Sequence, residues 1–288
     1  MRGSHYPGLE NAAELSAAAH AILVFLTTER TRVAKGKAGA DSSVMVTSQV
    51  MGQGLIDLAK ALYGEMPVFW GRYFTSTSTG GTVEYRHLKE NRALRDNNIR
   101  VLPIARQTKN VDGTFANGSA DAQNNADDLI TTFGAAYLAS LSSEFYMFLD
   151  VEGSPSVSQA YYTGWAQTLA AHSAASTGGA VTILPCVYAT QSDNPTWSAV
   201  SAAMAAGAPC KGAWIARWPV SGCQPLPNWD DRIVTPSVGI PCPILIWQYA
   251  DDCHGGGGFD CSETNPSIDL QDFLNHLILP PDMTGITT

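Results

Sequence analysis

The sequence lacks the features that define several common classes of protein. None of its six cysteines forms a CxxC pair, and its six histidines are scattered, so we expect no metal site. No apolar run approaches the roughly 20 residues that a membrane span needs. There is no G-x-G-x-x-G after the first predicted strand and no G-x-x-x-x-G-K-[ST], which argues against a nucleotide-binding fold, and we expect no cofactor.

Basic residues are also few. Lys and Arg number 17 against 26 Asp and Glu, which gives a formal net charge of −9. This charge argues against a nucleic-acid or anionic-membrane partner and fits a neutral or locally cationic substrate.

All six cysteines lie in the second half of the chain, and four of them are in Pro- or Gly-rich loop sequence. Loop disulfides would imply an oxidising compartment, whereas six reduced thiols would fit the cytosol, and the sequence leaves both interpretations open. If one disulfide forms, we expect it between Cys253 and Cys261.

The chain is predicted to have three parts: an N-terminal helical extension (1–35), a barrel (36–279) and a tail (280–288). Apolar residues at helical spacing predict a helix over 10–30, which is a candidate docking element for a protein partner. The opening MRGSH resembles a vector-derived leader, and no clear signal peptide is visible.

Between residues 36 and 279, apolar strands alternate with helices. Such an alternation predicts a parallel sheet with both faces covered. Seven strands are visible, with an eighth if the region ending at Asp41 forms one, and this number favours a (β/α)8-type TIM barrel over the alternative of an open doubly wound sheet. The predicted strands are 66–74, 99–107, 143–153, 180–189, 212–218, 244–250 and a short one that begins near 266.

Two carboxylates end the most apolar of these strands. Asp150 and Glu152 follow the run Phe145–Leu149 and, because side chains alternate along a strand, both point to the same face. Paired carboxylates at the end of a buried strand are costly unless they are used. A D-x-E motif alone is unspecific, and a strand end that simply reaches solvent is the alternative.

Other strand ends carry aromatic, amide and charged residues. In a barrel of this type the carboxyl ends of the strands build the site, and such residues suit the stacking and hydrogen bonding of a sugar. The candidate binding residues are Asp41, Tyr73, Gln107, Tyr188, Arg217, Trp218, Gln248 and Asp269. The alternation of faces also implies that Trp247 and Gln248 cannot both point into the barrel.

The motifs FLDVE, VYATQSDNPTW, AWIARW, IWQYA and IDLQDF occur in an order that resembles family 25 glycoside hydrolases, the muramidases of cell-wall-lytic enzymes. VFWGRYF and VLPIARQ are closer to the glycoside-hydrolase-like barrels of domain of unknown function 1906. The resemblance covers about residues 36–279. It implies five βα units followed by three strands with little helix, and an Asp251–Pro266 segment that is an insertion outside the pattern.

By this resemblance Glu152 is the general acid and Asp150 stays ionised, with Asp269 and Asp41 completing an acidic cluster. The implied activity is cleavage of an N-acetylated glycan such as peptidoglycan, outside the cell or at its envelope. Two other interpretations remain open: a carbohydrate-binding or structural barrel without turnover, and a component of an extracellular or phage-like assembly.

Overall fold

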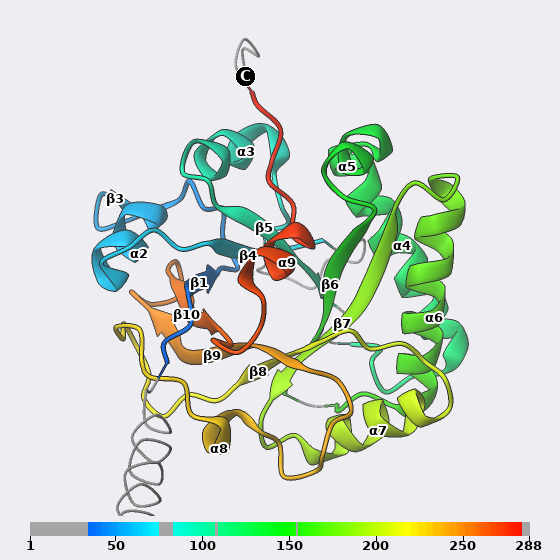
Figure 1. The fold of residues 1–288 in the computed structure, drawn as a ribbon. Coiled ribbons are helices and arrows are strands. Elements are labelled where there is room, and N and C mark those ends of the chain that lie inside the picture. The colour runs from blue at the N-terminus through cyan, green and yellow to red at the C-terminus, as the bar shows by residue number, and fades with distance from the viewer. Residues whose placement is uncertain (1–33, 75–82, 107–108, 154, 284–288) are drawn as a thin grey trace, which may run out of the picture. The chain divides into compact units, whose positions relative to one another are not determined.

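Eight strands close into a barrel in the computed structural model, which describes residues 34–74, 83–106, 109–153 and 155–283 (Figure 1). The strand order is β1-β10-β9-β8-β7-β6-β5-β4. The strands are β1 (Ala38–Asp41), β4 (Phe69–Tyr73), β5 (Arg100–Arg106), β6 (Glu144–Val151), β7 (Thr182–Thr190), β8 (Ala213–Ala216), β9 (Ile244–Cys253) and β10 (Phe259–Thr264). A separate hairpin joins β2 (Gln49–Val50) to β3 (Gln53–Gly54).

β10 is the irregular member of the barrel. Neighbouring strands from β4 to β9 run parallel, as do β1 and β4, whereas β10 runs antiparallel to both β9 and β1. The predicted barrel with an irregular last part is therefore confirmed. The expected strand near 266 is wrong, because the eighth strand comes from the segment that the sequence interpretation set aside as an insertion.

The alternation of side chains along β6 shows why apolar runs make these strands. Phe145, Met147 and Leu149 point outward into the core beneath the helices, whereas Tyr146 and Phe148 point into the lumen. Both faces are buried, so almost every position must be apolar. Each such side chain contributes about 1.5–3 kcal/mol by leaving water.

Helices cover the outside of the barrel (Figure 1). Side-chain caps begin five of them: Thr114 and Asn117 form a capping box at α4, Ser158 caps α6, Asp193 caps α7 ahead of a first-turn proline, and Asp230 and Asp269 cap α8 and α9. Residues 115–141 form two helices, which are divided at Gly134 with φ 81°. The helices are α2 (Leu55–Tyr63), α3 (His87–Asp96), α4 (Phe115–Phe133), α5 (Ala135–Leu141), α6 (Gln159–Ser176), α7 (Asn194–Ala205), α8 (Asp231–Val234) and α9 (Leu270–Asn275).

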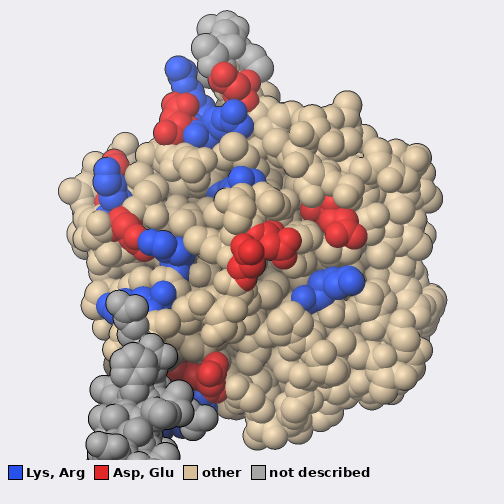
Figure 2. Space-filling view, in the orientation of Figure 1, with Lys and Arg blue, Asp and Glu red and all other residues tan. Residues whose placement is uncertain are grey.

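α9 packs against the N-terminal part of the barrel strands. The Phe273 ring contacts Phe69 edge-on, with 5.9 Å between the ring centroids, and lies tilted against Tyr146 at 6.3 Å. The ring of His276, the residue that follows α9, stacks on Tyr146. In Figure 1 this helix lies across the middle of the barrel, and Figure 2 shows acidic side chains over it; Asp269 and Asp272 are its exposed acids. This acidic patch is therefore at the end opposite to the carboxyl ends of the strands.

The predicted extension and tail lie largely outside the described residues. Nothing in the structure tests the helix 10–30, and the tail is described only as far as Met283. The first residues of that tail contact the barrel: Pro280 accepts a hydrogen bond from Arg95, and Met283 is buried against Asn91.

Helices are sparse in the last part of the barrel. Within residues 217–269, all of which the structure describes, the only helix is the four-residue α8. None of the helices in the described ranges is both long enough and apolar enough to cross a membrane.

Candidate active site

Strand register brings the predicted polar residues to one level at the C-terminal end of the barrel. Asp150 on β6 pairs with Arg106 on β5 and with Tyr188 on β7. On the other side of the barrel, Asp41 at the end of β1 pairs with Asp260 on β10. The strands thereby place at least three carboxylates in one layer.

Gly71 makes room for Asp41 within this layer. A Cβ atom at this position would lie 2.7 Å from the Cβ of Asp41 and 2.9 Å from Ile104. Only glycine fits there without moving Asp41, because real Cβ contacts are longer.

A hydrogen-bonded chain centred on Gln248 links the members of the site. The Gln248 amide nitrogen donates to Asp41 at 3.0 Å, and its carbonyl oxygen accepts from Trp218 Nε1 at 2.9 Å and from the Tyr188 hydroxyl at 2.8 Å. An indole N–H can only donate, so the Trp218 contact fixes which end of the amide is oxygen.

Tyr188 also contacts Glu152. Its hydroxyl lies 3.2 Å from Glu152 Oε1 and 2.8 Å from the carbonyl oxygen of Gln248. Because a hydroxyl carries one hydrogen, it donates to one of these two oxygens at a time. The contact holds the carboxyl of Glu152 beside the Gln248 chain.

Asp150 is the most deeply buried carboxyl of the site. Its exposed fraction is 1%, and neither carboxylate oxygen has a hydrogen-bond partner among the described residues. Burial, followed by the negative charge of Glu152, raises the pKa of Asp150 well above its usual value, while Arg106 acts to lower it. This burial opposes the ionised state that the resemblance implies for Asp150.

The two other carboxyls of the cluster are shifted in the same direction. Burial and the neighbouring Asp260 raise the pKa of Asp41 well above its usual value, although the hydrogen bond from Gln248 opposes this. Burial raises the pKa of Asp260 to about 7, against the hydrogen bond that it accepts from the Asp252 backbone. Such a cluster keeps protons near neutral pH, which is the condition for general-acid chemistry.

An open pocket of about 330 Å³ lies over this cluster. This volume is at the lower end of those of small-molecule sites. Among the described residues, the charged side chains that line it are Arg106 and the carboxylates Asp41, Glu152, Asp251, Asp252 and Asp260. The guanidinium of Arg106 lies 5.5 Å from the centroid of the Tyr73 ring. Asp150 lines a smaller space that shares Asp41 and Tyr73 with the pocket.

The structure thus unites seven of the ten predicted site residues: Asp41, Tyr73, Asp150, Glu152, Tyr188, Trp218 and Gln248. Gln107 lies outside the described residues. The Arg217 side chain is exposed and does not line the pocket, although its backbone oxygen accepts from Trp247. Trp247 packs outside the barrel against Trp229 and Tyr249, which leaves Gln248 to point inward.

Asp269 does not belong to the cluster, which corrects that expectation. It caps α9 by accepting hydrogen bonds from the backbone of Gln271 and Asp272. Sequence reasoning missed Asp260, which occupies a place in the acidic layer. The one local signal for it is the glycine-rich turn 255–258, since glycine is typical of hairpin loops.

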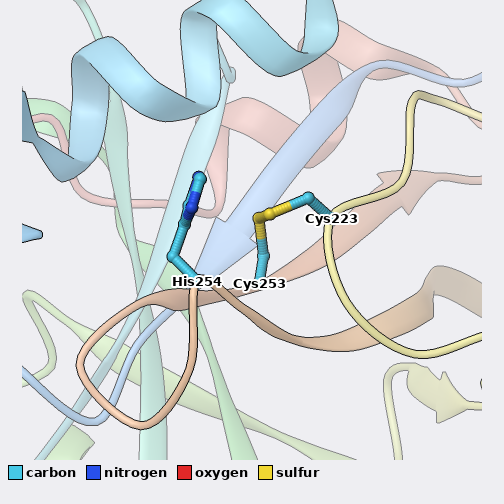
Figure 3. Close-up of side chains that lie close together, drawn as sticks. All are labelled: Cys223, Cys253 and His254. Carbon is cyan, nitrogen blue, oxygen red and sulfur yellow. A yellow bond between two sulfur atoms is a disulfide. The ribbon is translucent and has the colours of Figure 1, made fainter. Parts of the chain in front are cut away.

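A disulfide between Cys223 and Cys253 ties the loop after β8 to the β9–β10 hairpin that lines the pocket (Figure 3). The expected pair, Cys253 with Cys261, is therefore wrong. His254 lies close to both sulfur atoms, and these three residues are the group whose spacing would suit a metal ion. They do not fit one in this state, because both sulfurs are already used in the covalent bond.

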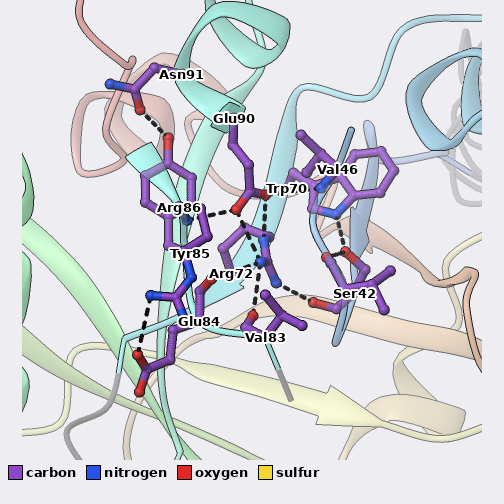
Figure 4. Close-up of polar contacts among 11 residues, drawn as sticks. Ser42, Val46, Trp70, Arg72, Val83, Glu84, Tyr85, Arg86, Glu90 and Asn91 are labelled. Atoms are coloured by element: carbon purple, nitrogen blue, oxygen red, sulfur yellow. Dashed lines mark hydrogen bonds and ion pairs between the residues drawn. The ribbon is translucent and has the colours of Figure 1, made fainter. Parts of the chain in front are cut away.

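A buried ion pair outside the barrel holds the loop that follows Asp41 (Figure 4). Arg72 and Glu90 are fully buried and 2.8 Å apart. Arg72 donates to the backbone oxygen of Ser42 at 2.6 Å, and Glu90 accepts from the backbone nitrogen of Val46 at 2.9 Å. The pair therefore fixes Ser42, which lines the pocket.

Replacing Arg72 by Met is expected to lower the free energy of unfolding by about 3–5 kcal/mol, because Glu90 is left buried without its partner. Denaturant unfolding measures this change. The matched control is Arg92→Met, which removes an exposed ion pair to Asp96 and should cost less than about 1 kcal/mol. Equal losses in the two variants would contradict the role given to the buried pair.

Comparison with known proteins places the fold. No family model matches the sequence, and no curated protein matches it. Among solved structures, an uncharacterized protein from B. stearothermophilus shares 20% identity at a TM-score of 0.62, over 84% of this chain and 100% of that chain. The Clostridium perfringens spore cortex lytic enzyme SleM shares 16% identity at a TM-score of 0.50, over 81% of this chain and 68% of that chain.

A muramidase from Acremonium alcalophilum has 17% identity and a TM-score of 0.45, over 83% of this chain and 99% of that chain. At such identities the likeness to the first two structures concerns the fold. The chain shares with these two structures the fold of a closed eight-stranded barrel covered by helices.

Proposed function

We propose that this protein is a glycoside hydrolase that cleaves N-acetylated glycans such as peptidoglycan. The observation that carries the proposal is the pairing of Glu152, which lines the open pocket and contacts Tyr188, with a buried Asp150 whose oxygens have no hydrogen-bond partner among the described residues. Glycoside cleavage needs a proton donor and a second carboxyl in different environments. The resemblance of the sequence to muramidases supports the substrate class.

Glu152 is the proton donor in this proposal, because it lines the open pocket where a glycosidic oxygen would lie. Its proton passes to the leaving oxygen as the bond to the anomeric carbon breaks. The positive charge that develops on the sugar is stabilised by the surrounding carboxylates, and water then adds to the anomeric carbon and returns a proton to Glu152.

Asp150 recognises the acetamido group. Neither of its oxygens has a hydrogen-bond partner in the part of the chain that the structure describes, and the N–H of an acetamido group would supply one. A hydrogen bond to the charged form lowers the pKa of a carboxyl, so substrate binding would return Asp150 toward the ionised state. Asp150 then orients the acetamido group against the anomeric carbon.

A second candidate is a glycan-binding barrel without turnover. The burial of Asp150 favours it, because a neutral carboxyl stabilises a cation less than an ionised one does. This candidate predicts that saccharides bind, that no product forms, and that binding is indifferent to the charge of Glu152.

Incubation with purified peptidoglycan and with a panel of chitin-type oligosaccharides tests the proposal. The release of new reducing ends from at least one N-acetylated glycan is expected. Saccharide binding without release, from a folded protein, would select the binding barrel, and neither binding nor release would refute both candidates.

A further inference from the structure

A second pair of sulfur atoms lies in contact at the end of the barrel opposite to the site. Cys210 Sγ and Cys242 Sγ are 3.4 Å apart, and both residues are buried. A disulfide requires about 2.05 Å between its sulfurs, so the two atoms need to approach by about 1.4 Å, which is within reach of small side-chain rotations.

The backbone on both sides of the pair is fixed. Cys210 precedes β8 and Cys242 precedes β9, two strands that are neighbours in the barrel. Ala213 donates to the backbone oxygen of Pro243 at 2.9 Å, and the hydroxyl of Tyr162 donates to that of Pro209 at 3.0 Å. The two thiols are therefore brought together by the short segments that lead into two paired strands.

We propose that Cys210 and Cys242 are a cystine site, so that the oxidised protein carries a second disulfide interleaved with Cys223–Cys253. The oxidant is a small disulfide such as glutathione disulfide, met during folding before the thiols are buried. One of the two sulfurs attacks it and releases one glutathione, and the other sulfur then attacks the mixed disulfide and releases the second. The two thiol protons pass to the two glutathione molecules.

The second disulfide would stabilise a part of the barrel that has few helices around it. Residues 217–269 hold one four-residue helix, so this part of the barrel lacks the helical cover of the rest. Along the chain the cysteines alternate as 210, 223, 242 and 253, so the two bonds together would link β8 and the loop after it to both ends of β9, which pairs with β10. These strands and the loop after β8 carry Trp218, Gln248 and Asp260 of the site.

Thiol counting on the full-length protein, refolded in a glutathione redox buffer and then denatured, tests the proposal. Two of the six cysteines, Cys186 and Cys261, are expected to remain free, and non-reducing peptide mapping should find Cys210 joined to Cys242. Four free thiols beside an intact Cys223–Cys253 bond would overturn the proposal, as would a bond from Cys210 to any other cysteine. The thiol count of the unmodified protein decides the question even if no variant folds.

The single variants Cys210→Ser and Cys242→Ser add a second measurement. Each is expected to lower the Tm of the oxidised protein by roughly 5–10 °C, because the loop that the bond closes regains its entropy in the unfolded state. The double variant should lose no more than either single variant, because only one bond is removed. Additive losses, unchanged by reductant, would mean that the two thiols merely pack.

Discussion

Glu152→Gln is expected to reduce glycan hydrolysis by about 100- to 10,000-fold while the protein remains folded and still binds saccharide. The amide has nearly the shape of the carboxyl but no proton to give to the leaving oxygen, and the lost factor is that of one general acid. Reducing-end release under saturating glycan measures the turnover, and calorimetric titration with the same glycan measures the binding.

The matched control for this variant lies on the same strand. Glu144→Gln changes a partly exposed glutamate at the opposite end of β6, where it contacts His276 at 3.7 Å. It should leave turnover within about twofold, because it lies far from the reacting atoms. If both variants turned over like the unmodified protein, Glu152 would not be the acid.

The unfolding free energy is expected to fall by about 1–3 kcal/mol between about pH 5 and about pH 8. Burial raises the folded-state pKa of Asp41 and Asp150 well above their usual values and that of Asp260 to about 7. A carboxyl with a raised folded-state pKa stabilises the protein fully below its unfolded pKa and loses that contribution as the pH rises through the folded value. Stability should therefore decline as the pH rises from the usual carboxyl pKa of about 4 towards the raised folded-state values.

Asp150→Asn isolates one member of this effect. The amide does not ionise, so the loss of stability between the two pH values should be smaller in the variant than in the unmodified protein. Both proteins are measured at both pH values, and the change in unfolding free energy between the two pH values is compared. The destabilisation that the substitution itself causes is present at both pH values and therefore cancels in this comparison. The exposed Asp112→Asn serves as the control and should leave the pH dependence unchanged. An identical pH dependence in all three proteins would contradict the neutral, buried state of Asp150.

The sequence predicts the parallel part of the barrel well, for a physical reason. Strands such as β6 are buried on both faces, and this produces apolar runs whose ends can be located to within a few residues. The carboxyl ends of parallel strands lie at the same end of a barrel. The sequence therefore also predicts that the strand-end residues Asp150, Glu152, Tyr188 and Gln248 lie close together. Even the four-residue β1 ends at Asp41, as predicted.

The antiparallel part could not be predicted in the same way. β10 carries Asp260, Ser262 and Glu263 among its six residues, and so shows no apolar run. Its pairing with β1 joins segments more than 200 residues apart in the sequence, which no local pattern reveals. For the same reason the final motif IDLQDF was placed in the barrel, where Asp269 would have joined the cluster, whereas it begins α9.

The predicted disulfide between Cys253 and Cys261 is wrong because residues that are close in the sequence need not be close in space. Cys261 lies only eight residues after Cys253, but in β10 it is a buried free thiol. Cys223, in a loop 30 residues before Cys253, lies next to it because the loop after β8 returns to the β9–β10 hairpin. Such an approach follows from the closure of the barrel and has no signature in residue spacing.

The central claim is that the carboxyl cluster at the C-terminal end of the barrel breaks a glycosidic bond. The most direct test is digestion of peptidoglycan in water enriched in heavy oxygen, by the unmodified and the Glu152→Gln proteins, with mass analysis of the products. The account predicts soluble fragments whose reducing-end sugar carries one heavy oxygen, formed by the unmodified protein and lost in the variant. Heavy oxygen found only on peptide carboxyls, or no fragments from the folded protein, would contradict it.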